Sequence, residues 1–253
     1  MVASALTMLA GSQSATGQDT TCAEAQAAAA EMAGARLIVE YNATDEDLGV
    51  HGQFEADGWS ELCVFDPTGK LVLEIRPQSQ LRDLGVGSIF FESQEPPAEQ
   101  FSFDELKAAF PEGEYSVRAV ALDGQILGGS ADFTHDIPAA PSIIRPTVAE
   151  DEASADSAVV PIDGRAVEWE PVTETVEGEP VTITAYEVII TNLEHDDPHG
   201  FSQPVFDVHV PASTNLLTVS PEFLEPDTSY ELEVLALELS GNQTISVGFF
   251  KTE

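Results

Sequence analysis

The densest group of metal-ligating residues in the first half of the chain lies in the segment ATDEDLG, residues 43–49. Asp45, Glu46 and Asp47 follow a predicted strand, and carboxylate oxygens gathered in a loop are the ligands that Ca²⁺ prefers. The spacing does not match an EF-hand loop, whose fifth and twelfth positions would be Gly49 and Ala56. The segment therefore predicts a calcium site, with a solvated acidic turn as the alternative.

A second group of metal-ligating residues lies in the segment EHDDPHG, residues 194–200. Its two imidazoles and two carboxylates, from His195, Asp196, Asp197 and His199, are side chains that Zn²⁺ accepts as ligands. The Pro and Gly of the same segment are typical of an ordinary hairpin loop, which is the alternative interpretation.

The remaining histidines, His51, His135 and His209, stand singly on predicted strands. A lone histidine on a strand is expected to be exposed or hydrogen-bonded to a neighbour. These three are therefore interpreted as structural residues.

Sequence signatures of catalysis are absent. The chain contains no Gly-x-Ser-x-Gly, no Gly-x-x-x-x-Gly-Lys and no His-Glu-x-x-His. Acids are so frequent that a pair of carboxylates suited to glycoside hydrolysis arises by chance. We therefore expect a non-enzymatic protein with no cofactor except Ca²⁺. The alternative is an enzyme or accessory subunit using acids of the first half such as Asp45, Asp47 and Asp57.

The charge of the chain excludes two classes of partner. The 253 residues include 45 Asp and Glu but only 9 Lys and Arg, for a formal net charge of −36. Such a surface repels nucleic acid phosphates and anionic lipid headgroups. No run of residues approaches the 18 or so apolar residues of a membrane span. Neither nucleic acid binding nor membrane insertion is expected.

The N-terminal residues and the cysteines bear on the compartment. Residues 1–21 begin with a short apolar stretch followed by small residues, like a clipped export signal without its basic region, or a disordered segment. Cys22 and Cys63 could form one disulfide or remain two buried thiols. We expect an exported protein that is secreted, periplasmic or at the cell surface.

The elements that must position these residues are mostly short strands. Residues 22–34 are rich in Ala and predict a helix that ends at Gly34. Strands are then predicted at 36–43, 50–56, 59–67, 71–77, 88–93, 114–122 and 126–137. Residues 102–110 predict a short helix with a capping box formed by Ser102 and Glu105. A Pro-rich linker over 138–146 precedes seven further short strands.

The second half resembles a known family. The segment AVEWEPV has an inward Trp169 two residues before Pro171, and YEVIIT at 186–191 is similar to the next strand of that family. The segment LEPDTSYELEVLALELSGN matches a pattern carried by Leu224, Pro226, Thr228, Tyr230, Val234 and Ala236. Residues 139–253 therefore resemble a fibronectin type III domain. The resemblance implies protein or polysaccharide contacts through loops and sheet edges.

The first half repeats part of this pattern. When Pro111 is set on Pro226, Tyr115 falls on Tyr230 and the following inward positions stay in register. In a sandwich, a Tyr at this corner bonds its hydroxyl to the backbone a few residues upstream. Both tyrosines are therefore interpreted as structural, and the first half resembles an immunoglobulin-like sandwich of unassigned family.

Together these observations predict an all-β fold with two tandem antiparallel β-sandwich domains. The first, over 35–138, is immunoglobulin-like, and the second, over 139–253, is fibronectin type III-like; a short N-terminal helix over 22–34 precedes them. The expected function is an exported, non-enzymatic binding or spacer protein that contacts protein or polysaccharide at the bacterial cell surface or exterior. The oligomeric state stays open.

Overall fold

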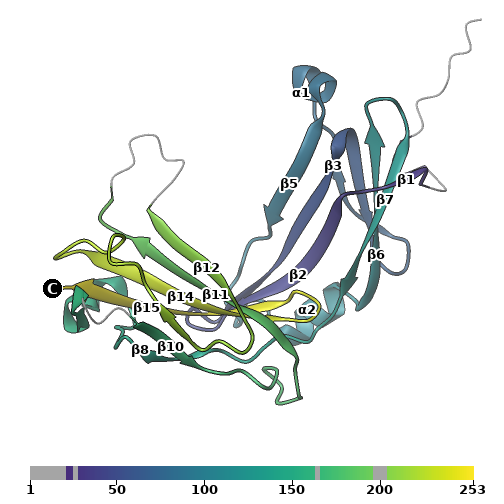
Figure 1. The fold of residues 1–253 in the computed structure, drawn as a ribbon. Coiled ribbons are helices and arrows are strands. Elements are labelled where there is room, and N and C mark those ends of the chain that lie inside the picture. The colour runs from purple at the N-terminus through teal and green to yellow at the C-terminus, as the bar shows by residue number, and fades with distance from the viewer. Residues whose placement is uncertain (1–20, 25–27, 163–165, 196–203) are drawn as a thin grey trace, which may run out of the picture.

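The computed structural model describes residues 21–24, 28–162, 166–195 and 204–253. It contains two β-sandwiches that meet at an angle, so that the molecule is an open V with one concave side (Figure 1). Each sandwich has its own hydrophobic core. The predicted all-β fold with two antiparallel sandwiches is confirmed.

The first sandwich is organised around one long strand. Its strands are β2 (Gly34–Asn42), β3 (Asp47–Phe65), β4 (Leu71–Ile75), β5 (Val86–Glu92), β6 (Gly113–Ala121) and β7 (Ile126–Phe133). β3 joins the two strands predicted at 50–56 and 59–67. Its first part pairs with β2 and β5, and its second part pairs with β4 and β6. The register shifts between Glu55 and Trp59, where Gly58 has φ 62°. A bend at this glycine lets one strand serve both layers.

Two short helices interrupt this sandwich. α2 (Phe103–Ala109) has the predicted capping box: the Ser102 hydroxyl accepts from the Glu105 amide, and the Glu105 carboxylate accepts from the Ser102 amide. α1 (Ser79–Leu84) was not predicted from the sequence. It buries none of its residues, so its short sequence carries no amphipathic pattern that would reveal it.

The predicted N-terminal helix over 22–34 is wrong. Residues 21–24 form a turn, Ala30 and Glu31 form the short strand β1, and β2 already begins at Gly34. β1 runs parallel to β7, where Ala28 lies so close to Gly128 that a Cβ on the glycine would be 2.5 Å from the Ala28 Cβ. The small alanines fit against the glycines of β7, and this tertiary pairing outweighs their helix propensity.

The two cysteines form a disulfide. Cys22 and Cys63 are both fully buried and bonded to each other, and they contact Phe65. The bond attaches the N-terminal segment to the second part of β3. The sequence left open whether these residues were bonded, because nothing in it brings Cys22 near the strand.

The second sandwich has three strands facing four. β8 (Ser142–Arg145), β10 (Ala166–Glu170) and β13 (Leu216–Thr218) form the smaller sheet. β11 (Ile183–Asn192), β12 (Val205–Pro211), β14 (Ser229–Glu238) and β15 (Gln243–Thr252) form the larger one, and β9 (Val159–Val160) adds to β15. A 3-10 helix, η1 (Glu152–Ser157), covers one end. β8 lies within the residues predicted to be the linker.

The corner tyrosines have the role that the sequence predicts. The Tyr230 hydroxyl accepts a hydrogen bond of 2.8 Å from the Glu225 amide, and the Tyr115 hydroxyl donates one of 3.1 Å to the Pro111 carbonyl. Both side chains are buried in the cores. Tyr230 therefore has a structural role at a corner of the sandwich.

The two sandwiches share a sheet. β15 pairs in parallel with β2, with Gln243 opposite Glu40, Thr244 opposite Tyr41 and Ile245 opposite Asn42. This pairing joins the larger sheet of the second sandwich to the first sandwich in one sheet of 12 strands.

Buried hydrogen bonds reinforce this junction. The Asn242 side chain is 1% exposed; its carbonyl accepts from the Val39 amide, and its amide donates to the Thr134 carbonyl and hydroxyl. The Thr244 hydroxyl donates to the Pro138 carbonyl. Backbone pairing and a satisfied buried amide therefore hold the sandwiches at a defined angle.

Candidate functional site

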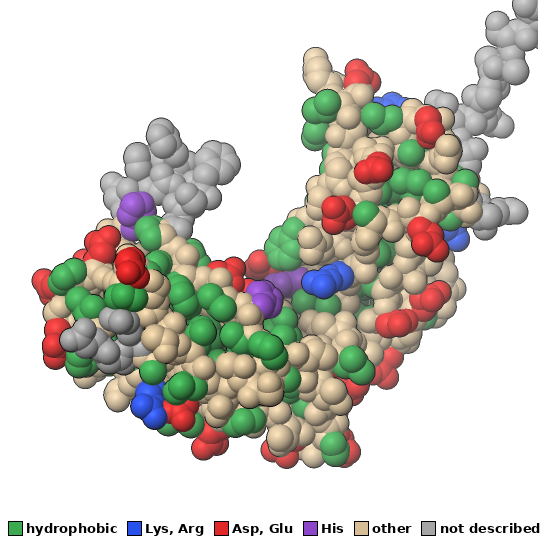
Figure 2. Space-filling model, in the orientation of Figure 1, with side chains coloured by type: hydrophobic (Ala, Val, Ile, Leu, Met, Phe, Trp, Pro, Cys, Tyr) green, Lys and Arg blue, Asp and Glu red, His purple; other side chains and the backbone are tan. Residues whose placement is uncertain are grey.

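The concave side of the V contains a groove at the junction of the two sandwiches (Figure 2). Residues alternate along a strand, so the side chains that fill the cores leave their neighbours on the other face. On β2, Val39 is buried in the core and Glu40 faces the groove; on β14, Val234 is in the core and Glu233 faces the groove. Because β2 and β15 are paired, these outer faces form one continuous wall.

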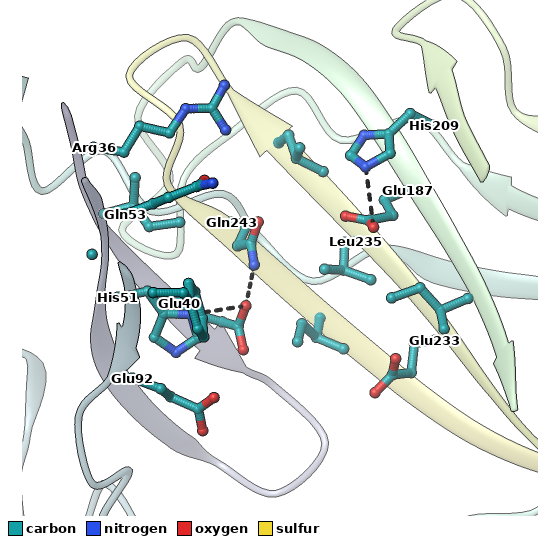
Figure 3. A pocket seen from close by; sticks show the side chains of 16 residues that line it. Arg36, Glu40, His51, Gln53, Glu92, Glu187, His209, Glu233, Leu235 and Gln243 are labelled. Carbon is teal, nitrogen blue, oxygen red and sulfur yellow. Dashed lines mark hydrogen bonds and ion pairs between the residues drawn. The ribbon is translucent and has the colours of Figure 1, made fainter. Parts of the chain in front are cut away.

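We call this space the concave groove. It has a volume of about 510 Å³. Its lining combines acids, two histidines, one arginine, amides and apolar side chains, with Arg36, Glu40, His51, Gln53, Phe90 and Glu92 from the first sandwich and Glu187, His209, Glu233, Leu235, Gln243 and Ile245 among those from the second. Figure 3 shows side chains of both sandwiches around this space, among them the labelled Arg36 and His51 from the first and His209 and Glu233 from the second.

One buried histidine forms the chemical centre of the first-sandwich wall. His51 lies on β3 between two carboxylates: its Nε2 is 2.9 Å from Glu95 Oε1 and its Nδ1 is 3.7 Å from Glu40 Oε2. The Glu40 carboxylate also accepts a hydrogen bond from the Gln243 amide across the junction (Figure 3). Burial raises the pKa of Glu40, an effect that the neighbouring His51 opposes. We call Glu40, His51 and Glu95 the His51 cluster.

The second-sandwich wall carries a more exposed group. Glu187 and His209 lie opposite each other on β11 and β12, with 3.1 Å between His209 Nε2 and Glu187 Oε1, and Asp207 lies beside them. His209 is 58% exposed. Burial raises the pKa of Glu187, although His209 opposes this.

Glu233 is the most perturbed carboxyl in the concave groove. Burial, together with the charges of Glu231, Glu40 and Glu187, raises its pKa to about 7. A carboxyl surrounded by others in a partly desolvated groove holds its proton well above the ordinary range. The groove therefore contains acids that a cationic or hydrogen-bonding ligand would stabilise.

The three acids predicted to bind calcium do not line the concave groove. Asp45 accepts a hydrogen bond from the Asn42 amide, Glu46 has φ 56° in the turn, and Asp47 begins β3. Among the described residues, three groups of metal-ligating side chains have their ligand atoms within 4.8 Å of one another, and Asp45, Glu46 and Asp47 are not one of them. The calcium site at this turn stays a prediction.

Two other predicted groups can also be placed. Asp57 lies ten residues beyond Asp47 on the same strand, so about 30 Å separates them at the usual rise per residue, and the two do not share a site. In the proposed zinc segment, Asp196, Asp197 and His199 lie outside the described residues.

Sequence reasoning missed the His51 cluster. His51 was interpreted as a single structural histidine, and neither Glu40 nor Glu95 was singled out. A polar position every second residue on β2 and β3 is also the pattern of an ordinary solvated sheet face. No signal in the sequence shows that the second sandwich folds over this face.

No protein-family model matches the chain, and no curated protein matches it. Among solved structures, the chain is similar to the chicken CNTN1 FN1-FN3 domains, with 14% identity and a TM-score of 0.31 over 88% of this chain and 64% of that one. It is also similar to a tetra-tandem repeat in the extending region of a large adhesion protein, with 13% identity and a TM-score of 0.28 over 87% and 50%. A third is from a 1.5-MDa bacterial ice-binding adhesin, with 13% identity and a TM-score of 0.26 over 86% and 64%.

The chain thus spans less than two thirds of each of these structures. Its own fold and site define it as an acidic, two-domain β-sandwich protein with a groove between the domains. No helix among the described residues is long and apolar enough to cross a membrane.

Proposed function

We propose that this chain is an exported, non-enzymatic binding protein that holds a protein or polysaccharide ligand in the concave groove at the cell surface or exterior. The observation that carries the proposal is the pairing of β2 with β15. This pairing makes the outer faces of both sandwiches one surface, lined from both sides. A flexible spacer between two sandwiches needs no such shared sheet.

The chemistry of the lining suits a ligand with many hydrogen-bonding groups. Carboxylates, imidazoles and the amides of Gln53 and Gln243 accept and donate hydrogen bonds, and Phe90 offers an aromatic ring that is 60% exposed. An exposed aromatic ring beside polar groups can stack on the apolar face of a sugar ring or a side chain. The net charge of −36 favours neutral or basic ligands over anionic ones.

Binding of defined probes tests the proposal. The purified chain is titrated with a neutral β-glucan oligomer, a chitosan oligomer and a short oligolysine peptide, each at low and high salt. We expect one of the three to bind and Phe90→Ala to weaken its binding ten-fold or more. Leu84→Ala is the matched control, because Leu84 is an exposed apolar residue on α1 that does not line the groove.

Three outcomes would contradict the proposal. Failure of all three probes would remove the groove as a binding site for these ligands, and equal weakening by Leu84→Ala would move binding elsewhere. Release of reducing ends from a saccharide probe, abolished by Glu233→Gln, would instead favour an enzyme.

A further inference from the structure

The His51 cluster brings three metal-ligating side chains together from three separate segments. Glu40 comes from β2, His51 from β3 and Glu95 from the loop after β5, and their ligand atoms all lie within 4.8 Å of one another. The side chains are 14%, 7% and 23% exposed, respectively. One imidazole and two carboxylates in a mostly desolvated position are a donor set that Zn²⁺ and related ions accept.

The distances within the cluster are close to those around a metal ion. Ligand atoms about 2.1 Å from a tetrahedral ion are about 3.4 Å apart. His51 Nε2 and Glu95 Oε1 are 2.9 Å apart, and Glu40 Oε2 is 3.7 Å from the other ring nitrogen. The two carboxylates face different ring nitrogens, so one of these side chains must rotate before a single imidazole nitrogen and both carboxylates bind the same ion; their ligand atoms already lie within 4.8 Å of one another.

Negative charge exceeds positive charge around the cluster. The negative charge of Glu92 repels that of Glu40, and the negative charge of Glu95 repels that of Asp47. A single imidazole, even when protonated, balances only one of these four carboxylates. Asp47 Oδ1 is also inaccessible to solvent and has no hydrogen-bond partner in the part of the chain that the structure describes. A buried carboxylate oxygen without a partner is costly, and a nearby cation would compensate it.

The position of Glu95 is fixed by a glycine. A Cβ added at Gly49 would lie 2.7 Å from both Cγ and Oε1 of Glu95, so only a glycine leaves room for this carboxylate. The backbone on both sides of Glu95 is also tied down: the Ser93 amide donates to the Val50 carbonyl, and Pro97 forms a β-bridge with Asp47. The carboxylate is thus held against the strand that carries His51.

We propose that Glu40, His51 and Glu95 bind one divalent transition-metal ion, Zn²⁺ in the first instance. The imidazole ligand favours Zn²⁺ over Ca²⁺, which prefers six to eight oxygen ligands. This site differs from the calcium site predicted at Asp45–Asp47 and goes beyond the ligand binding proposed for the concave groove. The ion would join β2, β3 and the loop after β5 at the junction, where Glu40 also contacts Gln243.

Zinc binding to the full chain tests this proposal. Chelator-treated protein is titrated with ZnCl₂ alone by calorimetry, and its melting temperature is measured over a series of Zn²⁺ concentrations. We expect one ion per chain and a melting temperature that rises with Zn²⁺, because a ligand that binds only the folded state stabilises it. Glu95→Gln and His51→Gln should each weaken binding ten-fold or more. Substitution with Co²⁺ should give a visible spectrum that disappears in both variants.

Controls separate this site from the other histidines. His209→Gln and His195→Gln should leave the affinity unchanged. Gly49→Ala should weaken zinc binding like Glu95→Gln, because it displaces the Glu95 carboxylate while retaining every ligand. If His51→Gln does not fold, Gly49→Ala and Glu95→Gln together decide the test. The proposal is overturned if the wild-type chain binds no Zn²⁺ or Co²⁺, if Glu95→Gln leaves the affinity unchanged, or if His209→Gln or His195→Gln abolishes binding.

Discussion

Replacing Glu233 with glutamine should stabilise the protein increasingly as the pH rises above 4.5, and most above pH 7. Burial and three neighbouring glutamates raise the pKa of Glu233 from its ordinary 4.5 to about 7. Below pH 4.5 this carboxyl is protonated in both the folded and the unfolded chain. Between 4.5 and 7 the unfolded chain loses the proton first, so the stability of the folded state falls as the pH rises. Above pH 7 Glu233 is ionised in both states, and the folded state is destabilised by the full free energy of burying this charge.

The size of the effect follows from the same pKa. At about 1.4 kcal/mol per pKa unit, the difference between 4.5 and 7 sets an upper limit of about 3.5 kcal/mol. Glu233 is only partly buried, so solvent screening reduces this to about 1–2 kcal/mol. Glu233→Gln removes the charge and keeps the shape, and it should recover that amount at pH 8 and almost nothing at pH 4.5.

Urea unfolding at pH 4.5 and pH 8 in the presence of EDTA measures the difference. The matched control is Glu170→Gln, an exposed glutamate at the end of β10, which should change the urea midpoint little at either pH. The reasoning is refuted if Glu233→Gln stabilises equally at both values, because the gain would then not come from ionisation. An unchanged midpoint at pH 8 would refute it as well.

Three further perturbations test the fold and the junction. Tyr230→Phe should destabilise the second sandwich by roughly 1 kcal/mol or more, because it removes the hydrogen bond that the Glu225 amide donates to the buried tyrosine; an unchanged urea midpoint would contradict this. Asn242→Ala should lower the free energy of unfolding by about 2–3 kcal/mol and broaden the angle between the sandwiches in X-ray scattering, because it leaves the Val39 amide and the Thr134 carbonyl of the first sandwich without this partner from the second; unchanged scattering curves would argue against a junction held by this amide. Replacing Cys22 and Cys63 with Ser should lower the free energy of unfolding by about 4 kcal/mol, because the disulfide closes a loop of 41 residues in the unfolded chain. Thermal unfolding with and without reductant measures this difference. Reductant should destabilise the wild-type chain and leave the variant unchanged.

Several elements could be predicted from the sequence because their causes are local. Alternation of apolar and polar residues predicted most of the strands, and the Ser102–Glu105 spacing predicted the capped start of α2. The spacing from Pro226 to Tyr230 predicted a corner whose hydrogen bond is present. Each of these depends on residues within a few positions of one another, where the chain has little freedom to vary the outcome.

The failures have one physical origin. The Ala-rich segment at 22–34 has high helix propensity, yet the glycines of β7 and the bond to Cys63 draw its flanking residues into a turn and a strand. The two strands predicted around Gly58 are one bent strand. In both cases a partner distant in sequence decides between two local structures of similar free energy.

For this protein, the sequence by itself determined the β-sandwich class, the acidic surface and the structural role of the corner tyrosines. Only the tertiary structure decided that β2 pairs with β15, and this single pairing creates the concave groove. Glu40 and Gln243 are 203 residues apart and meet only because of it. Long-range contacts depend on how complete faces of the two sandwiches fit together, and the spacing of residues within a short segment does not predict that fit.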